Sequence, residues 1–268
     1  MHPIAFHIGS FAIHSYGIMV ALAFLFGLWT ATLRAKREKI SGEKIADVTL
    51  WLMVGAILGA RFVYVTTYWK EEFAGQPWTE IFMIQHGGLV YYGGLIGAIV
   101  AGAIYIFWKK LPLWKTADVL APSIALGSVF GRAGCLLNGC CYGRPTNVPW
   151  AITFTNPQAH ELSGTPLFTP LHPTEIYDGA LNLGLYIFLA WLFRRKKFDG
   201  QVFATYLLCY AVTRSIVEYF RGDYSNLHYH FGLTPAQWIS VPIFITGLAL
   251  AVFLSRRELP KAVGSRQS

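Results

Sequence analysis

A stripe of alternating charges runs along one face of the apolar segment 201–220 and ends just beyond it. Tyr210, Arg214, Glu218 and Arg221 are spaced by four, four and three residues, so they share one side of a helix. A cation inside an apolar segment normally faces a partner or a wet cavity. Two interpretations follow: a self-neutralising ladder of ion pairs, or a net positive site whose guanidinium groups hold a phosphate.

The segment 131–144, with the sequence GRAGCLLNGCCYGR, is a second candidate for chemistry. Its glycines suit close approach of backbone amides to an anion, although glycines also serve ordinary turns. Cys135, Cys140 and Cys141 are spaced as Cys-x4-Cys-Cys, which matches no common zinc motif, and no second Cys or His pair accompanies them. We therefore expect structural cysteines, no metal and no cofactor.

Further polar residues lie near the ends of other apolar segments. Arg61 and Arg132 are costly cations in such places, and each is open to a structural or a functional interpretation. Tyr92 and His86 flank paired glycines, and His172 opens the segment 174–193. Three glycine pairs have the small-xxx-small spacing that is typical of tight helix packing. These pairs are Gly55/Gly59, Gly93/Gly97 and Gly127/Gly131.

The elements that carry these residues are long and apolar. With 54% hydrophobic and only 13% charged residues among 268, the chain is far more apolar than a soluble domain. Its apolar runs have about 20 residues each, which is enough to cross a bilayer. We expect an all-α integral membrane protein with seven transmembrane helices. They lie near 14–33, 45–68, 88–108, 116–137, 174–193, 201–220 and 236–255.

Basic residues give the expected orientation. Most of the 22 Lys and Arg residues cluster after the first, third, fifth and seventh apolar runs, near 34–44, 109–115, 194–197 and 256–266. The positive-inside rule makes those loops cytoplasmic, with the N-terminus outside and the C-terminus inside. The net charge of +8 thus reflects membrane topology, and we expect no nucleic-acid partner.

A polar segment between the fourth and fifth apolar runs, residues 138–172, is rich in Pro, Thr, Asn and Gly. It predicts a small extracytoplasmic head. The head interrupts what we expect to be a single polytopic membrane domain spanning residues 1–268, without the internal repeat that marks inverted-repeat transporters.

Taken in order, these blocks make the chain resemble prolipoprotein diacylglyceryl transferases over nearly its whole length. The family signature Gly-Arg-x-Gly/Ala-Asn-Phe-x-Asn-x-Glu-x-x-Gly is matched at Gly131, Arg132, Gly134, Asn138 and Gly143. The chain departs from it at Cys135, Leu136 and Cys140, and Tyr92 stands where several members have a histidine. The segment 214–221 matches the family pattern Arg-x-x-x-Glu-x-x-Arg.

The resemblance implies transfer of diacylglyceryl from phosphatidylglycerol to the lipobox cysteine of preprolipoprotein signal peptides, in the bacterial inner membrane and among membrane lipids. It implies Arg132, Arg214 and Tyr92 as catalytic residues. The implied substrate-binding residues are Tyr16, Gly93, Gly94, Arg132, Asn138, Gly143, His172, Tyr210, Arg214, Glu218 and Arg221. A transporter or flippase of an anionic lipid, or a lipid-binding member without transferase activity, remains an alternative.

Overall fold

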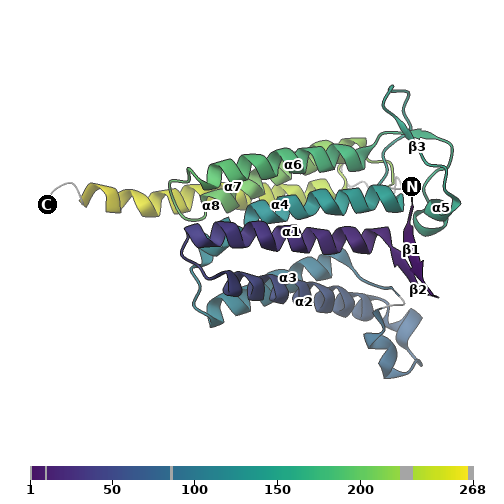
Figure 1. Cartoon of the computed structure of the whole chain (residues 1–268), viewed down its shortest axis with the longest axis horizontal. Coiled ribbons are helices and arrows are strands. Elements are labelled where there is room, and N and C mark those ends of the chain that lie inside the picture. Colours follow the sequence, from purple (N-terminus) through teal and green to yellow (C-terminus); the bar gives the residue numbers. More distant parts are fainter. Residues whose placement is uncertain (1, 10, 85–86, 224–231, 265–268) are drawn as a thin grey trace. The chain divides into compact units, whose positions relative to one another are not determined.

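The computed structural model describes residues 2–9, 11–84, 87–223 and 232–264, and most of them are helical (Figure 1). The long helices are α1 (Ser15–Arg37), α2 (Gly42–Thr67), α3 (Tyr91–Trp108), α4 (Leu113–Asn138), α6 (Thr174–Phe193), α7 (Gln201–Phe220) and α8 (Pro235–Gly264). The shorter elements are β1 (Ile4–Ile8), β2 (Phe11–His14), the π-helix η1 (Trp69–Phe73), the 3-10 helix η2 (Trp78–Phe82), β3 (Ile152–Thr153), α5 (Pro157–Ser163) and β4 (Pro170–Leu171).

Within the described part of the chain, six helices are long and apolar enough to cross a membrane: α1, α2, α3, α4, α6 and α8. Large apolar side chains on them point outwards, and those of Leu25, Phe62 and Ile96 are more than 60% exposed. Apolar surface of this extent suits contact with lipid tails. The expectation of a mostly helical integral membrane protein is confirmed. Helix α7 has 20 residues but falls outside the six, because Arg214 and Glu218 make it more polar.

The structure adds two small antiparallel sheets that an all-α description omits. One pairs β1 with β2 directly before α1, and its turn contains Gly9 at a positive φ of 62°. His14 therefore ends a strand, and α1 begins one residue later. The other pairs β3 with β4 inside the segment 138–172, which also contains α5, capped by the Asn156 side chain.

The chain forms two compact units, residues 32–116 and residues 1–31 together with 117–268. In the first unit, α2 and α3 meet along glycines. A Cβ atom built on Gly59 would lie 2.3 Å from the carbonyl oxygen of Gly93, and one on Gly97 would lie 2.2 Å from that of Gly55. Only glycine fits there, so the predicted packing role of these two glycine pairs is confirmed.

The third predicted glycine pair, Gly127/Gly131, does not form such a contact. A Cβ atom on Gly127 would be 3.9 Å from Ala23, and one on Gly131 would meet no atom of the described residues within 4 Å. At this level the rings of Phe26 and Phe130 stack 5.2 Å apart between α1 and α4. The aromatic pair separates the two helices, so the prediction of close glycine packing was wrong here.

A buried carboxylate fixes α7 against α4 in the larger unit. Asp118 is fully buried and accepts hydrogen bonds from the backbone amides of Gly200 and Phe203, 2.8 and 3.0 Å away. The Lys196 ammonium lies 2.9 Å from the same carboxylate. These bonds hold the first turn of α7 against α4. They therefore also fix how far the polar stripe at the other end of α7 lies along α4.

Candidate functional site

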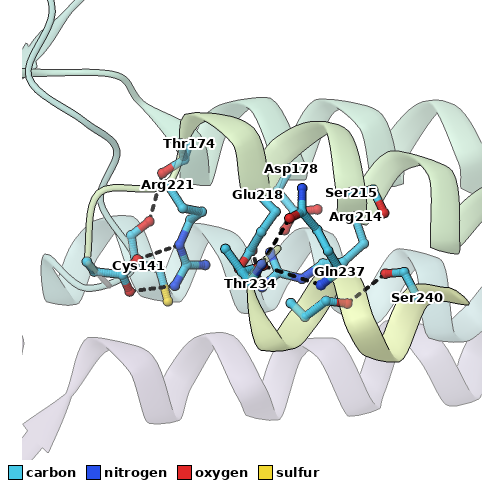
Figure 2. A network of polar contacts seen from close by, with 12 residues as sticks. Cys141, Thr174, Asp178, Arg214, Ser215, Glu218, Arg221, Thr234, Gln237 and Ser240 are labelled. Atoms are coloured by element: carbon cyan, nitrogen blue, oxygen red, sulfur yellow. Dashed lines mark hydrogen bonds and ion pairs between the residues drawn. The ribbon is translucent and has the colours of Figure 1, made fainter. Parts of the chain in front are cut away.

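The polar stripe of α7 contains an ion pair and an unmatched donor. Nη2 of Arg214 lies 2.7 Å from a carboxylate oxygen of Glu218, whose side chain is completely buried. Nη1 of Arg214 is also buried and has no hydrogen-bond partner among the described residues. Figure 2 shows both side chains beside the start of α8, where Thr234 and Gln237 form a reciprocal cap. The guanidinium is therefore oriented and only partly satisfied.

A second arginine is oriented in the same way from a neighbouring helix. Nε of Arg132 on α4 lies 2.7 Å from a carboxylate oxygen of Asp178 on α6. The other oxygen of Asp178 accepts a hydrogen bond of 2.6 Å from the Asn182 amide, one turn along α6. Because this pair uses Nε, it leaves the two Nη groups of Arg132 available to another acceptor.

A third arginine, Arg221 at the end of the stripe, is hydrogen-bonded more completely. Arg221 is buried and donates through Nε and Nη2 to both carboxylate oxygens of Asp223. Its carbonyl oxygen accepts a hydrogen bond of 3.0 Å from Nε of Arg144. This bidentate pair uses the planar fork of Arg221, so its side chain supports the site rather than offering a free fork to a ligand.

Three chain segments meet at a junction beside these arginines. The Gly143 amide donates to the His172 carbonyl, the Arg144 amide to the Phe220 carbonyl, and the Gly222 amide to the Tyr142 carbonyl. A Cβ atom on Gly143 would lie 2.4 Å from the His172 carbonyl oxygen. Gly143 is thus required because three backbones come together.

The end of α4 brings the three cysteines together. Their Sγ atoms all lie within 4.8 Å of one another, and the Asn138 side chain hydrogen-bonds to Cys140. Hydrogen bonds from the thiols of Cys135 and Cys140 lower the pKa of Cys141, and the charges of Arg221 and Arg132 lower it further. The pKa of the Cys141 thiol therefore lies below that of an ordinary cysteine.

Two acids of α6 belong to this site and were not singled out from the sequence. Asp178 holds Arg132, and Glu175 is 2% exposed with neither carboxyl oxygen hydrogen-bonded within the described part of the chain. The charge of Glu175 interacts with those of Cys141, Arg221 and Arg132. Both acids follow His172 in an otherwise apolar helix, and an acid at such a position was the available signal.

Three other predicted residues lie in the same unit. Tyr16, in the first turn of α1, lies against Gly134 on α4. A Cβ atom on Gly134 would be 3.0 Å from the Tyr16 ring. The His172 ring lies 3.2 Å from the Tyr177 hydroxyl. The Tyr210 ring stacks on that of Tyr206, with centroids 5.8 Å apart.

The remaining predicted residues belong to the unit 32–116. Tyr92 is 45% exposed in the first turn of α3, and Gly93 and Gly94 pack against α2. Arg61 donates to backbone carbonyls of the segment 80–88, among them Ile81 at 2.8 Å and Gly87 at 2.8 Å. These bonds give Arg61 a structural role in holding the segment 80–88. His86 lies outside the described residues.

The fold and the site together define a class: a polytopic helical membrane protein with arginine–carboxylate pairs buried among its helices. Residues 3–253 match the family model for prolipoprotein diacylglyceryl transferase. The chain belongs to this family.

Relatives in several bacterial groups support the assignment. The chain is 35% identical to the phosphatidylglycerol–prolipoprotein diacylglyceryl transferase of Finegoldia magna, over 94% of this chain and 95% of that protein. It is 35% identical to the protein of the same name from Bordetella avium, over 96% of both chains. It is also 33% identical to the one from Gloeobacter violaceus, over 96% of this chain and 94% of that protein.

Proposed function

We propose that this protein transfers the diacylglyceryl group of phosphatidylglycerol to the lipobox cysteine of a preprolipoprotein signal peptide. The products are a thioether-linked lipoprotein precursor and glycerol phosphate. The names of the relatives support the choice of both substrates. The reaction is the first step of lipoprotein maturation.

The buried Nη1 group of Arg214 is the observation that carries the proposal. A charged donor without a partner in an apolar environment is costly, and an anionic oxygen would satisfy it. We propose that this group and the Nη groups of Arg132, which its pair with Asp178 does not use, bind the oxygens of one phosphate from two helices. Glu218 and Asp178 then act as positioning residues that hold the two guanidinium groups.

The reaction depends most on stabilising the negative charge that develops on this phosphate. The acceptor thiol loses its proton, and the thiolate attacks the glyceryl carbon that is bonded to the phosphate oxygen. A C–S bond forms while the C–O bond breaks, and the bonding electrons leave with the phosphate. Arg132 and Arg214 stabilise that developing charge where water is scarce. Asn138 and Tyr210 shape the surrounding headgroup site.

We further propose that all seven long helices span the bacterial inner membrane, with the N-terminus outside and the C-terminus in the cytoplasm. Helix α7 has the necessary length, and its polar stripe serves the site. In this arrangement the segment 138–172 is an extracytoplasmic head, and both compact units belong to one membrane domain. The basic residues at 34–44, 109–115 and 194–197 support this orientation.

The test is a transfer assay with protein purified in detergent. It is incubated with phosphatidylglycerol and a peptide that contains a lipobox cysteine, and peptide mass is measured. The proposal requires a gain of one diacylglyceryl group, with none on a peptide that has serine in place of cysteine. Lipid binding without a mass gain would identify a non-catalytic member of the family, and lipid movement across vesicles without transfer would identify a flippase.

A further inference from the structure

Cys135, Cys140 and Cys141 form a cluster of soft ligands that the reaction described above does not use. Their three Sγ atoms lie within 4.8 Å of one another. Zn–S bonds of about 2.3 Å place the sulfurs of a tetrahedral site about 3.8 Å apart. A shift of each sulfur by less than about 1 Å therefore converts this arrangement into a zinc site, which side-chain rotation can supply.

The backbone holds the cluster in this arrangement. Cys141 has a φ of 69° and Gly139 a φ of 80°, so two residues in the left-handed region turn the chain back on itself after α4. The Cys141 carbonyl accepts a hydrogen bond of 2.7 Å from the Thr174 hydroxyl, which ties the turn to the start of α6 (Figure 2). A non-glycine residue in that region costs energy, and the surrounding structure compensates for it.

Glu175 provides an independent indication of a ligand. Its carboxyl group is 2% exposed, has no hydrogen-bond partner among the described residues, and interacts electrostatically with Cys141. Its oxygens do not belong to the group of ligand atoms within 4.8 Å of one another. The cluster thus supplies three protein ligands, the number found in zinc sites that keep one position for a substrate.

We propose that Cys135, Cys140 and Cys141 bind a thiophilic divalent cation of the Zn²⁺ type, and that its fourth position accepts the thiol of the acceptor peptide. The second half rests on the proposed function. Cys209, on α7, lies outside the group. The spacing in the sequence did not predict this site, because common zinc motifs place their ligands in two pairs. Here a single turn of the chain brings all three cysteines together.

The proton balance follows from the ligand set. Binding of the cation releases three protons from the enzyme thiols to solvent. Coordination of the acceptor thiol releases a fourth proton, which also passes to solvent. The resulting metal-bound thiolate is the nucleophile that forms the C–S bond. Arg132 and Arg221 offset the negative charge of the thiolates, since both interact electrostatically with Cys141.

The first experiment measures metal binding alone. Reduced protein in detergent is stripped with a chelator, incubated with Zn²⁺, freed of excess metal and assayed for zinc per chain. We expect about one equivalent for the wild type and for Cys209→Ser, and at least a tenfold weaker affinity for Cys135→Ser, Cys140→Ser and Cys141→Ser. Because a serine variant can misfold, wild-type alkylation is followed in parallel. Zinc should protect the three clustered cysteines and leave the rate at Cys209 unchanged.

The second experiment tests the fourth position. Co²⁺ replaces Zn²⁺, and the thiolate-to-cobalt absorption is recorded before and after addition of the lipobox peptide. The cysteine peptide should intensify this band, and the serine peptide should leave it unchanged. Identical spectra with both peptides would overturn the substrate-binding half of the proposal.

The two proposals fail separately. Transfer activity in a protein that takes up no zinc after full reduction would overturn the metal site and leave the proposed function intact. Zinc bound at one equivalent without diacylglyceryl transfer would overturn the proposed function and the acceptor thiol as ligand, while supporting the metal site. A disulfide within the cluster that prevents zinc uptake even under reducing conditions would also overturn the metal site.

Discussion

The Nε atom of Arg132 on α4 lies 2.7 Å from Asp178 on α6, so two helices that are separated in the sequence by the segment 138–172 are joined by one ion pair. The side chain of Asp178 is 6% exposed and that of Arg132 is 22% exposed. Loss of either partner at this depth is destabilising, because it leaves a charge uncompensated, and the pair also fixes the direction of the guanidinium group. The predictions that follow separate these two contributions.

Arg132→Lys and Arg214→Lys should each lower diacylglyceryl transfer by about a hundredfold or more, because an ammonium group cannot replace a planar fork that grips two phosphate oxygens. Transfer is measured at matched amounts of folded protein. Arg194→Lys, an exposed change in the loop after α6, is the control and should be neutral. Near wild-type rates in both site variants would show that these arginines only hold helices together.

The pair Arg214–Glu218 should behave differently in stability and in activity. Removing one partner leaves a buried charge and costs about 3–5 kcal/mol, whereas replacing both with methionine should cost much less than the two single changes combined. Thermal unfolding of Arg214→Met, Glu218→Met and the double variant in detergent measures the coupling. Transfer activity should remain lost in the double variant, and its recovery would contradict the phosphate-binding role.

Asp178→Asn should reduce kcat/KM by about tenfold to a hundredfold, since a neutral amide still accepts one hydrogen bond but no longer holds Arg132 by charge. Asp199→Asn offers a comparison, because Asp199 is 37% exposed in its ion pair with Lys196. That change should cost about 1 kcal/mol or less and leave kcat/KM unaltered. Equal effects of both substitutions would argue against a positioning role for Asp178.

Gly143→Ala should destabilise the protein by about 1–3 kcal/mol or more, because the new methyl group would meet the His172 carbonyl oxygen at 2.4 Å. Gly184→Ala is the matched control, since no atom lies within 4 Å of the built Cβ in the middle of α6 and alanine favours a helix. Melting temperatures in detergent compare the two variants. A Gly143→Ala protein as stable as the control would contradict the tight junction.

A reporter fused after Arg257 should be active in the cytoplasm and inactive outside, because most basic loops then face the cytoplasm. A second fusion within the segment 145–150 should give the opposite result. Outside activity of the first fusion would reverse the orientation and remove the proposed extracytoplasmic head.

Six of the seven long helices were predicted within four residues at each end, because hydropathy and length determine them almost without tertiary information. Helix α8 was predicted to end near residue 255 and continues to Gly264. The observed bounds Thr174–Phe193 and Gln201–Phe220 match the expected segments, and the polar stripe of α7 was visible from its helical spacing. The pairing of Arg214 with Glu218 was predicted, whereas the partners of Arg132 and Arg221 were not. Asp178 lies 46 residues after Arg132, and nothing in the local pattern indicates that α6 turns this acid toward α4.

The cysteine cluster and the Gly127/Gly131 pair also depend on contacts that spacing in the sequence does not predict. Whether Gly127 and Gly131 pack closely depends on the neighbouring side chains, and the stacked rings of Phe26 and Phe130 decide it. Likewise, three cysteines without a second ligand pair gave no metal motif, and only the left-handed turn at Cys141 reveals that their sulfur atoms converge. Spacing predicts contacts along a helix, whereas these features depend on how segments meet.

The junction at Gly143 also has a consequence for biosynthesis. Arg144 hydrogen-bonds to the carbonyl of Arg221, 77 residues later in the chain, and the Gly222 amide bonds to Tyr142. These partners emerge from the ribosome only after α6 and α7 have been made. A nascent chain that has inserted α1 to α4 therefore lacks the backbone contacts that order the loop after α4. The junction beside the proposed phosphate site therefore forms late, during insertion of the last helices, and shorter chains that end before Arg221 cannot form it.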